Sequence, residues 1–304
     1  MAQQATPPRI AAVLSTAPAA ASVRLAAFQQ GMKALGYVEG QTIVIDAHSW
    51  VGATRPLAEL AAHVVRSNPA VIVVEGNSPI AALKQATTTI PIVMSVVGDP
   101  VGSGFVASIV RPGGNITGLA NSAEQLTAKR LELLKELVPG LTRVGVLHNP
   151  TNRTHPIFIR ETEAAAKTLA VTPVNYAFAS EADLERAFGS SARDRVEAFV
   201  VLPQPLAIAL RGSLADGALR HRIPVMFPSP EPVEVGGLAS YSPRHTDLWE
   251  RAATYVDRIL KGARPADLPI EQPTRFDLVL NLKTARALAL TIPPSLLLRA
   301  QTID

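Results

Sequence analysis

The chain of 304 residues contains no cysteine, and this absence excludes disulfide scaffolds, thiolate zinc sites and cysteine nucleophiles. No apolar run reaches the ~20 residues that a membrane-spanning helix needs. Phosphate-binding loops, the dinucleotide glycine fingerprint and the Gly-x-Ser-x-Gly elbow are also missing. The pair Gly113-Gly114 follows an expected helix and not a strand, which is the wrong context for such a fingerprint. The sequence therefore carries no signature of a common catalytic site, and no enzyme is predicted.

The chain also lacks a concentrated basic region, although its net charge is +4 and its pI is about 9.6. Lysine and arginine are scattered and often lie beside acids, as Lys129-Arg130 does near Glu132. Neither a basic run nor basic-aromatic interleaving occurs, so the charge favours a solvated surface and no nucleic-acid partner. The six histidines show no metal-ligand spacing with acids. We therefore expect neither a metal nor a cofactor.

Apolar strands alternate with amphipathic helices along the first 110 residues. The strands are expected at 9–15, 42–47, 71–74 and 90–97 and the helices at 21–35 and 56–66, with a third helix capped by Ser78 and begun by Pro79. Continuous apolar strands in such an alternation are typical of a parallel sheet that helices cover on both faces. The sequence thus predicts an α/β fold.

The segment 96–121 organises the rest of the chain. Asp99-Pro100 pairs an N-cap residue with proline, which predicts a helix that lasts until Arg111 and ends at Pro112-Gly113-Gly114. Residues 115–119 then leave as an extended piece, which we interpret as a first crossover between two lobes. The alternation restarts with a helix at 123–137 and strands at 143–147, 171–177, 198–202 and 224–227.

The last part of the chain departs from this alternation. We expect a strand-like link at 236–241, a helix at 248–260, an extended segment at 270–280, a short helix at 282–288 and a terminal loop at 292–294. Periodicity does not assign these pieces to either lobe.

Polar residues gather where the expected strands end. Open parallel sheets bind ligands at the carboxyl ends of their strands, and hydroxyl and amide groups suit hydrogen bonding of a small molecule without transforming it. The predicted contacts in the first lobe are Ser15, Thr16, Asn77, Ser78 and Asp99. Those in the second lobe are Asn149, Gln204 and Phe227, with Tyr241 at a hinge.

Several of these residues have two interpretations. Asp99 either caps a helix, worth ~0.5–2 kcal/mol, or turns its carboxylate to the ligand. Trp50 and Tyr241 either pack in the ordinary way or form an aromatic wall, and His148 is a further candidate contact at the end of its strand.

Five segments resemble one group of ABC-transporter substrate-binding proteins, the group that includes tryptophan- and tyrosine-binding members. The first is Asp99-Pro100-Val101-Gly102-Ser103-Gly104, followed by Arg111-Pro112-Gly113-Gly114-Asn115-Ile116-Thr117-Gly118. The others are Gly236 to Tyr241, Ile259 to Pro265, and Asn281 to Ala285 with Ile292 to Leu297. The similarity extends, in order, over nearly the whole chain.

The resemblance implies a type I periplasmic binding-protein fold, in which two Rossmann-like lobes joined by three strands close over a ligand. The lobes would be 1–119 plus 242–271 and 120–241 plus 272–304, with crossings near Leu119-Ala120, Ser240-Tyr241 and Glu271-Pro273. A monomeric periplasmic or otherwise extracytoplasmic protein is implied, which hands a small molecule to the membrane permease of an ABC importer. Export through a secretory signal missing from this sequence is also implied, and the small, polar segment 1–8 fits the start of a mature exported chain.

Two departures from the family pattern bear on the ligand. Members often carry an acid in the loop after the strand that ends at Leu202, where this chain has Pro203-Gln204-Pro205. This difference removes one plausible partner of an amino-acid ammonium group. In addition, Ala289 replaces a usual glycine. An amino acid is thus not favoured over an aromatic carboxylate or another small organic ligand. Two other classes of protein stay open. One is an effector-binding domain related to transcription regulators, although the sequence shows no helix-turn-helix before Arg9. The other is an α/β enzyme of unknown chemistry.

Overall fold

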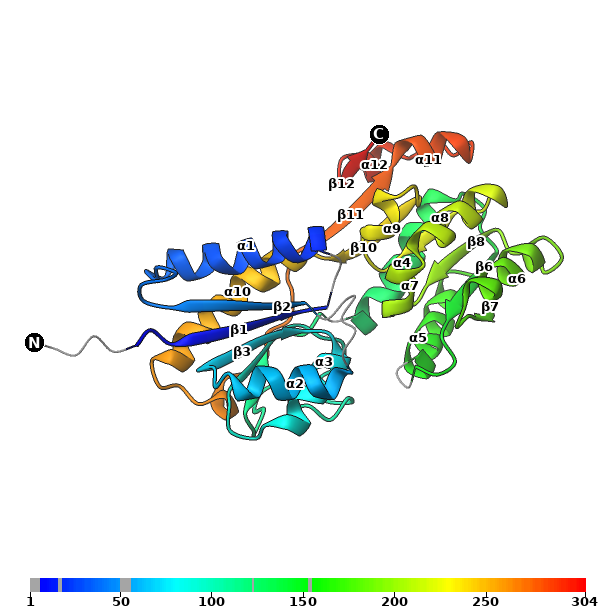
Figure 1. Cartoon of the computed structure of the whole chain (residues 1–304). Coiled ribbons are helices and arrows are strands. Elements are labelled where there is room, and N and C mark those ends of the chain that lie inside the picture. The colour runs from blue at the N-terminus through cyan, green and yellow to red at the C-terminus, as the bar shows by residue number, and fades with distance from the viewer. Residues whose placement is uncertain (1–5, 16–17, 50–55, 122, 153–154) are drawn as a thin grey trace, which may run out of the picture. The chain divides into compact units, whose positions relative to one another are not determined.

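The structure, a computed structural model, describes residues 6–15, 18–49, 56–121, 123–152 and 155–304. The chain divides into two compact units (Figure 1). Unit 1 comprises Met1–Ser122 and Arg244–Thr274, and unit 2 comprises Ala123–Pro243 and Arg275–Asp304. The chain therefore passes from one unit to the other three times, after Ser122, Pro243 and Thr274.

The described residues of unit 1 form a parallel sheet in the order β2-β1-β3-β4-β5. Its strands are β1 (Arg9–Leu14), β2 (Val44–Ser49), β3 (Val71–Glu75), β4 (Ile92–Val96) and β5 (Ile116–Gly118). Its helices are α1 (Pro18–Ala34), α2 (Leu57–Arg66), α3 (Asn77–Ala86) and α10 (His245–Leu260), with a 3-10 turn at η1 (Pro265–Asp267). Every residue of β3 is buried because helices cover both faces of the sheet, which explains the apolar run from Val71 to Val74.

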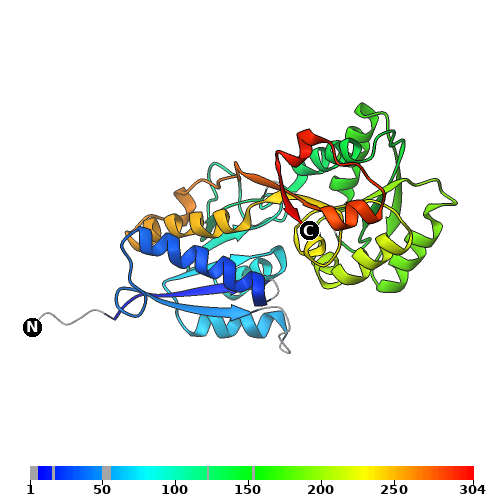
Figure 2. The ribbon, with the colours of Figure 1, turned by 90° about the horizontal axis from the view of Figure 1, so that it is seen from above.

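Two apolar cores lie on the two faces of this sheet. Helices α1 and α10 lie side by side on one face, although the chain leaves unit 1 and returns between them (Figures 1 and 2). Their core centres on Trp249, whose ring packs edge-on against Phe28 with centroids 6.2 Å apart. Helices α2 and α3 cover the other face. The tail helix that periodicity left unassigned thus completes the core of unit 1.

Unit 2 has a seven-stranded sheet in the order β12-β11-β10-β9-β8-β6-β7, in which only the β10–β11 pair is antiparallel. Its strands are β6 (Arg143–His148), β7 (Thr172–Ala177), β8 (Ala198–Val201), β9 (Val225–Phe227), β10 (Ala239–Pro243), β11 (Phe276–Asn281) and β12 (Ala300–Ile303). Its longer helices are α4 (Ala123–Leu137), α5 (His155–Thr168), α6 (Glu181–Ser191) and α8 (Arg211–Arg220). Its short helices are α7 (Pro205–Ala209), α9 (Glu231–Glu234), α11 (Leu282–Ala287) and α12 (Pro294–Leu297).

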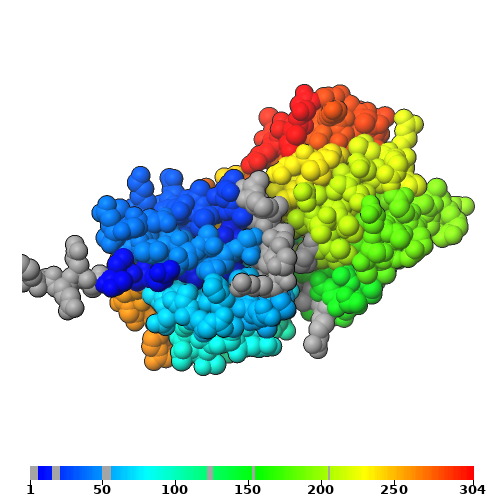
Figure 3. Space-filling view, viewed as in Figure 1, coloured from blue at the N-terminus to red at the C-terminus, as the bar shows by residue number. Residues whose placement is uncertain are grey.

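The faces of the second sheet are also covered by different helices. Helices α4 and α5 pack on one face through a leucine-rich core that includes Leu131 and Leu134. Helices α6 and α8 pack on the other face around Phe188 and Phe199. The C-terminal segment lies at the surface of unit 2 in the space-filling view (Figure 3). Two α/β units with mainly parallel sheets confirm the predicted fold class.

The helix predicted from Asp99-Pro100 to Arg111 is wrong, because the chain forms a series of turns there. Asp99 has a φ of 35° and Gly104 a φ of 70°, both outside the helical region. The Asp99 carboxylate accepts a hydrogen bond of 2.7 Å from the Gly102 amide, which closes a local turn in place of a first helical turn. Gly102 and Gly104 also have low helix propensity. The turn closed by the Asp99 side chain is therefore favoured over the helix that Pro100 was expected to begin.

Three further predictions are corrected. Helix α3 begins at Asn77 with Gly76 at its N-cap position, so Ser78 is not the cap. The sequence predicts one helix from Pro205 to about Arg222, but this helix is interrupted at Leu210, which lies between α7 and α8. The terminal loop continues into α12 and strand β12, which joins the sheet beside β11. A four-residue edge strand has too few residues for its periodicity to be read from the sequence.

Candidate functional site

A buried carboxylate organises the carboxyl end of the sheet of unit 1. Glu75, the last residue of β3, is 2% exposed. Its Oε1 accepts a hydrogen bond of 2.8 Å from the backbone amide of Ser15, just after β1. Its Oε2 accepts bonds of 2.9 Å from Arg24 Nη1 and from Trp249 Nε1. Glu75 therefore ties the loop after β1 to both covering helices.

The same network reaches the start of α10. Arg24 Nη2 lies 2.8 Å from Nδ1 of His245. Because a guanidinium group only donates hydrogen bonds, Nδ1 is the acceptor and the imidazole carries no proton there. Arg24 is thus hydrogen-bonded both to the charged Glu75 and to the imidazole of His245. These bonds lower the free-energy cost of burying the Arg24–Glu75 ion pair. The sequence placed Glu75 at a strand end but did not single it out, because its partners are 51 to 174 residues away.

The loops after β3 and β4 are joined by Asn77. Its Nδ2 donates to the Gly98 carbonyl (3.0 Å) and to Ser103 Oγ (3.1 Å), and its Oδ1 accepts from the Gly98 amide (3.2 Å). Ser15 lies close by, because a Cβ atom on Gly76 would stand 2.8 Å from Ser15 Oγ. The structure therefore gathers Ser15, Asn77 and Asp99 on neighbouring loops. Ser78 is exposed on α3, and Thr16 and Trp50 lie outside the described residues.

In unit 2, a buried histidine joins two strand ends. His155 Nδ1 accepts a hydrogen bond of 2.8 Å from the Asn149 amide, and its Nε2 lies 3.1 Å from the Pro203 carbonyl. Since a carbonyl only accepts, the proton is on Nε2 and the ring is neutral. The Asn149 Oδ1 accepts from the amide and the hydroxyl of Thr151, within its own turn. His155 thus connects the loop after β6 to that after β8.

We expect the free energy of unfolding to fall as the pH drops below about 6.5, in part because of His155. Burial lowers the pKa of His155. The Pro203 hydrogen bond counters part of this lowering, and the nearby His148 adds a smaller lowering. The folded state therefore binds the proton less readily than the unfolded state, so the stabilisation is full above the unfolded pKa and is lost as the pH falls toward the folded pKa. Urea unfolding measured between pH 5 and 8 tests this expectation.

The matched variant for this pH series is His155→Gln, which retains a donor and an acceptor but does not titrate. Its unfolding free energy should vary less with pH over the same range than that of the wild type. The contribution of His148, whose pKa burial also lowers, remains in both proteins. Equal slopes for the two proteins would contradict the role of His155.

Gln204 stands out at the end of β8. It is 7% exposed, and neither its Oε1 nor its Nε2 has a hydrogen-bond partner among the residues that the structure describes. Leaving a buried polar group unpaired costs about 1–3 kcal/mol. Such a group is retained where another molecule supplies the partner, be it a water or a ligand.

The two aromatic candidates differ in exposure. Phe227 is completely buried between the helices and the sheet of unit 2, so its ring offers no surface in this structure. Tyr241 is half-buried on β10, and its ring stacks on Phe276 with centroids 5.8 Å apart. His148 is half-buried at the end of β6. Direct contact of these residues with a ligand stays a prediction.

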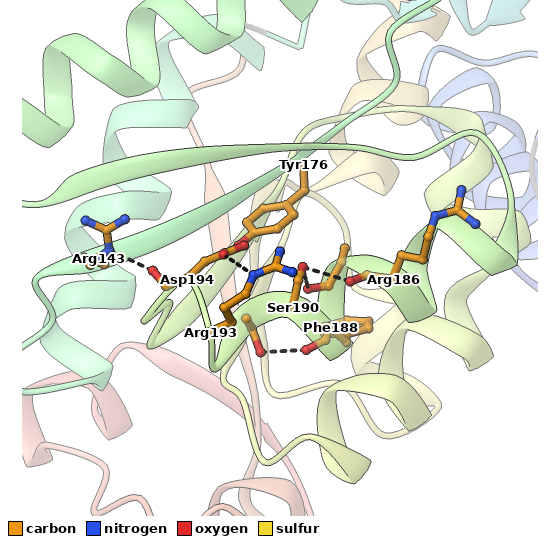
Figure 4. A network of polar contacts seen from close by, with 9 residues as sticks. Arg143, Tyr176, Arg186, Phe188, Ser190, Arg193 and Asp194 are labelled. Atoms are coloured by element: carbon orange, nitrogen blue, oxygen red, sulfur yellow. Dashed lines mark hydrogen bonds and ion pairs between the residues drawn. The ribbon is translucent and has the colours of Figure 1, made fainter.

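A different polar network lies in unit 2 where β8 begins (Figure 4). Asp194 accepts hydrogen bonds from the Tyr176 hydroxyl (2.8 Å) and Arg193 Nε (3.0 Å), and its backbone carbonyl accepts from Arg143 (3.0 Å). Burial, followed by the bond to Asp194, raises the pKa of Tyr176 to about 12. Because its polar groups are paired with one another, we assign this network to structural support.

Other kinds of site are not found in the described part of the chain. No group of three or more His, Cys, Asp or Glu side chains there is arranged to hold a metal ion. No helix there is long and apolar enough to cross a membrane.

Comparison with known proteins gives consistent matches. The model of a family described as ABC transporter substrate binding protein matches residues 10–303. A tyrosine-binding protein of Clostridioides difficile (strain R20291) is 25% identical over 261 residues, which are 86% of this chain and 75% of that protein.

Two solved structures are similar over nearly the whole chain. A conserved domain protein from Vibrio cholerae is 28% identical, with a TM-score of 0.86 over 98% of this chain and 100% of that one. An ABC domain from Streptococcus pneumonia in complex with L-Trp is 25% identical, also with a TM-score of 0.86 over 98% of this chain and 100% of that one.

Proposed function

Because the chain belongs to the family of ABC transporter substrate-binding proteins, we propose that it captures a small organic ligand, aromatic or amino-acid-like, for an ABC importer. This membership confirms the resemblance found in the sequence. The protein would act outside the cytoplasm as a monomer and present its bound ligand to the membrane permease. The family is one of binding proteins, and the proposed activity is binding without chemical change.

The observation that carries this proposal is the buried, unpaired amide of Gln204 at the carboxyl end of β8. In open α/β sheets this end is where ligands bind. The ligand class is supported by the relatives, since one is described as tyrosine-binding and another is in complex with L-Trp.

The proposed mechanism is closure of two lobes, 1–119 plus 242–271 and 120–241 plus 272–304. Contacts with both lobes exist together only in a closed state, so a ligand shifts the equilibrium toward that state by its differential affinity. Ser15, Thr16, Asn77, Ser78 and Asp99 would contribute from the first lobe. Asn149, Gln204 and Phe227 would contribute from the second, with Tyr241 at the hinge.

A thermal-shift screen of amino acids, aromatic acids and small amides tests the proposal. A compound at 100 times its dissociation constant stabilises the native state by about 2.7 kcal/mol and raises the melting temperature accordingly. A turnover assay of each hit should show no product. If no small molecule raised the melting temperature while DNA or a protein partner did, the proposed function would be wrong.

Gln204→Ala should weaken binding of the best hit of this screen about 10-fold, because one hydrogen bond of roughly 1.4 kcal/mol is lost. Isothermal titration calorimetry measures the change. The control is Gln301→Ala, which removes an exposed glutamine of β12 in the same unit and should leave the affinity unchanged. Equal affinities of the wild type and Gln204→Ala would remove Gln204 from the site.

A further inference from the structure

Arg130 is a buried cation without an anionic partner among the residues that the structure describes. It is 2% exposed on α4. Its Nε donates to the Tyr241 carbonyl (2.8 Å) and its Nη2 to the Pro228 carbonyl (3.4 Å), whereas Nη1 has no hydrogen-bond partner. Two neutral carbonyl groups therefore hold a guanidinium group that has five N–H donors.

This arrangement is costly for a structural arginine. A buried charge is normally paired with an opposite charge, and the buried Arg24 of unit 1 has such a partner in Glu75. Burial lowers the pKa of Arg130 to about 9, and the only group that counters this effect is Tyr241. At neutral pH the side chain stays charged, so the protein carries a buried positive charge that an anionic group would stabilise.

The strand register places Arg130 near Gln204. Ser240 of β10 is opposite Phe227 of β9, and Val200 of β8 is opposite Met226. Pro228 directly follows β9, and Tyr241 of β10 lies at the same level of the sheet because it follows Ser240. Both carbonyl groups therefore lie on strands that continue the sheet from β8.

Gln204 follows β8 in an extended conformation. Val200 and Leu202 belong to the core beneath α4 and α5. A bend at Pro203 separates Leu202 from Gln204, so Gln204 lies at the carboxyl edge of this core, in the loop between β8 and α7.

We propose that Arg130 recognises the carboxylate of the captured ligand, with the amide of Gln204 donating a second hydrogen bond to the same end of the molecule. The ligand class is then a small monocarboxylate, and its negative charge is required for binding. This inference rests on the proposed function and adds the chemical group that the ligand must present. The guanidinium would contribute charge-assisted bonds, which are about twice as strong as neutral ones.

Three acid and amide pairs serve as probes: 3-phenylpropionate, indole-3-propionate and L-tryptophan, each with its primary amide. Each pair has the same apolar part and differs in charge at one end. Calorimetry at pH 7 should show at least one acid that binds, with its amide about 10- to 100-fold weaker, the range expected for loss of a charged hydrogen bond. Amides that bind as tightly as their acids would overturn the inference.

Variants of Arg130 then test whether this residue causes the difference in affinity between acid and amide. Arg130→Gln should weaken binding of the acid about 10- to 100-fold and should reduce the difference between acid and amide, whereas Arg130→Lys should restore part of that difference. The control is Arg143→Gln, because Arg143 also donates from Nε to a carbonyl but lies where β6 begins; this variant should bind the acid as the wild type does. If Arg130→Gln does not fold, the acid–amide comparison in the wild type and the affinity of Arg130→Lys still decide.

The outcomes separate this inference from the proposed function. The inference is wrong if compounds of the wider screen bind but none of them needs a carboxylate. It is also wrong if Arg130→Gln binds the acids as the wild type does. Arg130 is then a structural residue whose Nη1 donates to water. In both cases the protein remains a binding protein. If no compound of the wider screen binds, the proposed function fails and the inference fails with it.

Discussion

Replacing Glu75 with alanine should lower the free energy of unfolding by about 3–5 kcal/mol, the cost of removing one member of a buried ion pair. The substitution removes the carboxylate that accepts from Ser15, Arg24 and Trp249. The indole N–H then loses its partner inside the core, and the guanidinium group loses its buried counter-ion. This is the largest effect expected from a single polar side chain in unit 1.

Urea denaturation followed by tryptophan fluorescence measures this change, since Trp249 is itself part of the network. The control is Asp46→Ala, which breaks the ion pair with the largely exposed Arg9 and should change the stability by no more than about 1 kcal/mol. Glu75→Gln should fall between the wild type and Glu75→Ala because an amide oxygen still accepts hydrogen bonds. A loss for Glu75→Ala as small as that of the control would show that the network adds little to stability.

Gly118→Ala should destabilise the protein by about 2–6 kcal/mol, the sum of backbone strain and overpacking. Gly118 has a φ of 128°, a region that residues with a Cβ atom rarely adopt. An added Cβ would stand 2.1 Å from the Met94 carbonyl oxygen and 2.6 Å from the Met94 nitrogen. Because these are backbone atoms of the paired strand β4, the clash is relieved only by separating β5 from the sheet.

A substitution at a second glycine, Gly36, distinguishes the cost of backbone strain from the cost of the steric clash. Gly36 follows α1 with a φ of 91°, and an added Cβ there would meet nothing within 4 Å. Gly36→Ala should therefore cost only the conformational part, about 1–3 kcal/mol. Thermal and urea unfolding of both variants measure the difference, and equal losses would mean that β5 moves to accept the methyl group.

The elements that the sequence predicted well are those whose information is local. The apolar run from Val71 to Val74 predicts a buried strand, and all five residues of β3 are buried. Helix α4 was placed with the bounds it has, Ala123–Leu137, because Pro139-Gly140 follows a clear amphipathic pattern. The helix predicted after Asp99 was wrong because the Asp99 side chain accepts a hydrogen bond from the Gly102 amide and closes a turn. A pattern of residue types does not show whether such a side chain caps a helix or closes a turn.

In the candidate site, too, the sequence revealed the features that depend on neighbouring residues and not those that depend on distant ones. The strand ends and their polar residues could be read from the alternation of strands and helices, and Gln204 was found as a departure from the family pattern. Arg130 was read only as one of the scattered basic residues, since its partners Pro228 and Tyr241 are 98 and 111 positions further along the chain. His155 was considered only as one of six histidines without metal-ligand spacing, although it connects Asn149 to Pro203.

The sequence by itself determined the α/β class, the two-fold repetition of the strand and helix pattern and the family, because burial periodicity and short motifs are properties of neighbouring residues. The tertiary structure alone decided the order of the strands and the pairing of Glu75 with Arg24 and Trp249. It also decided which buried polar groups have partners and which do not. The physical reason is that burial and pairing depend on contacts between residues far apart in the chain, and folding brings those residues together.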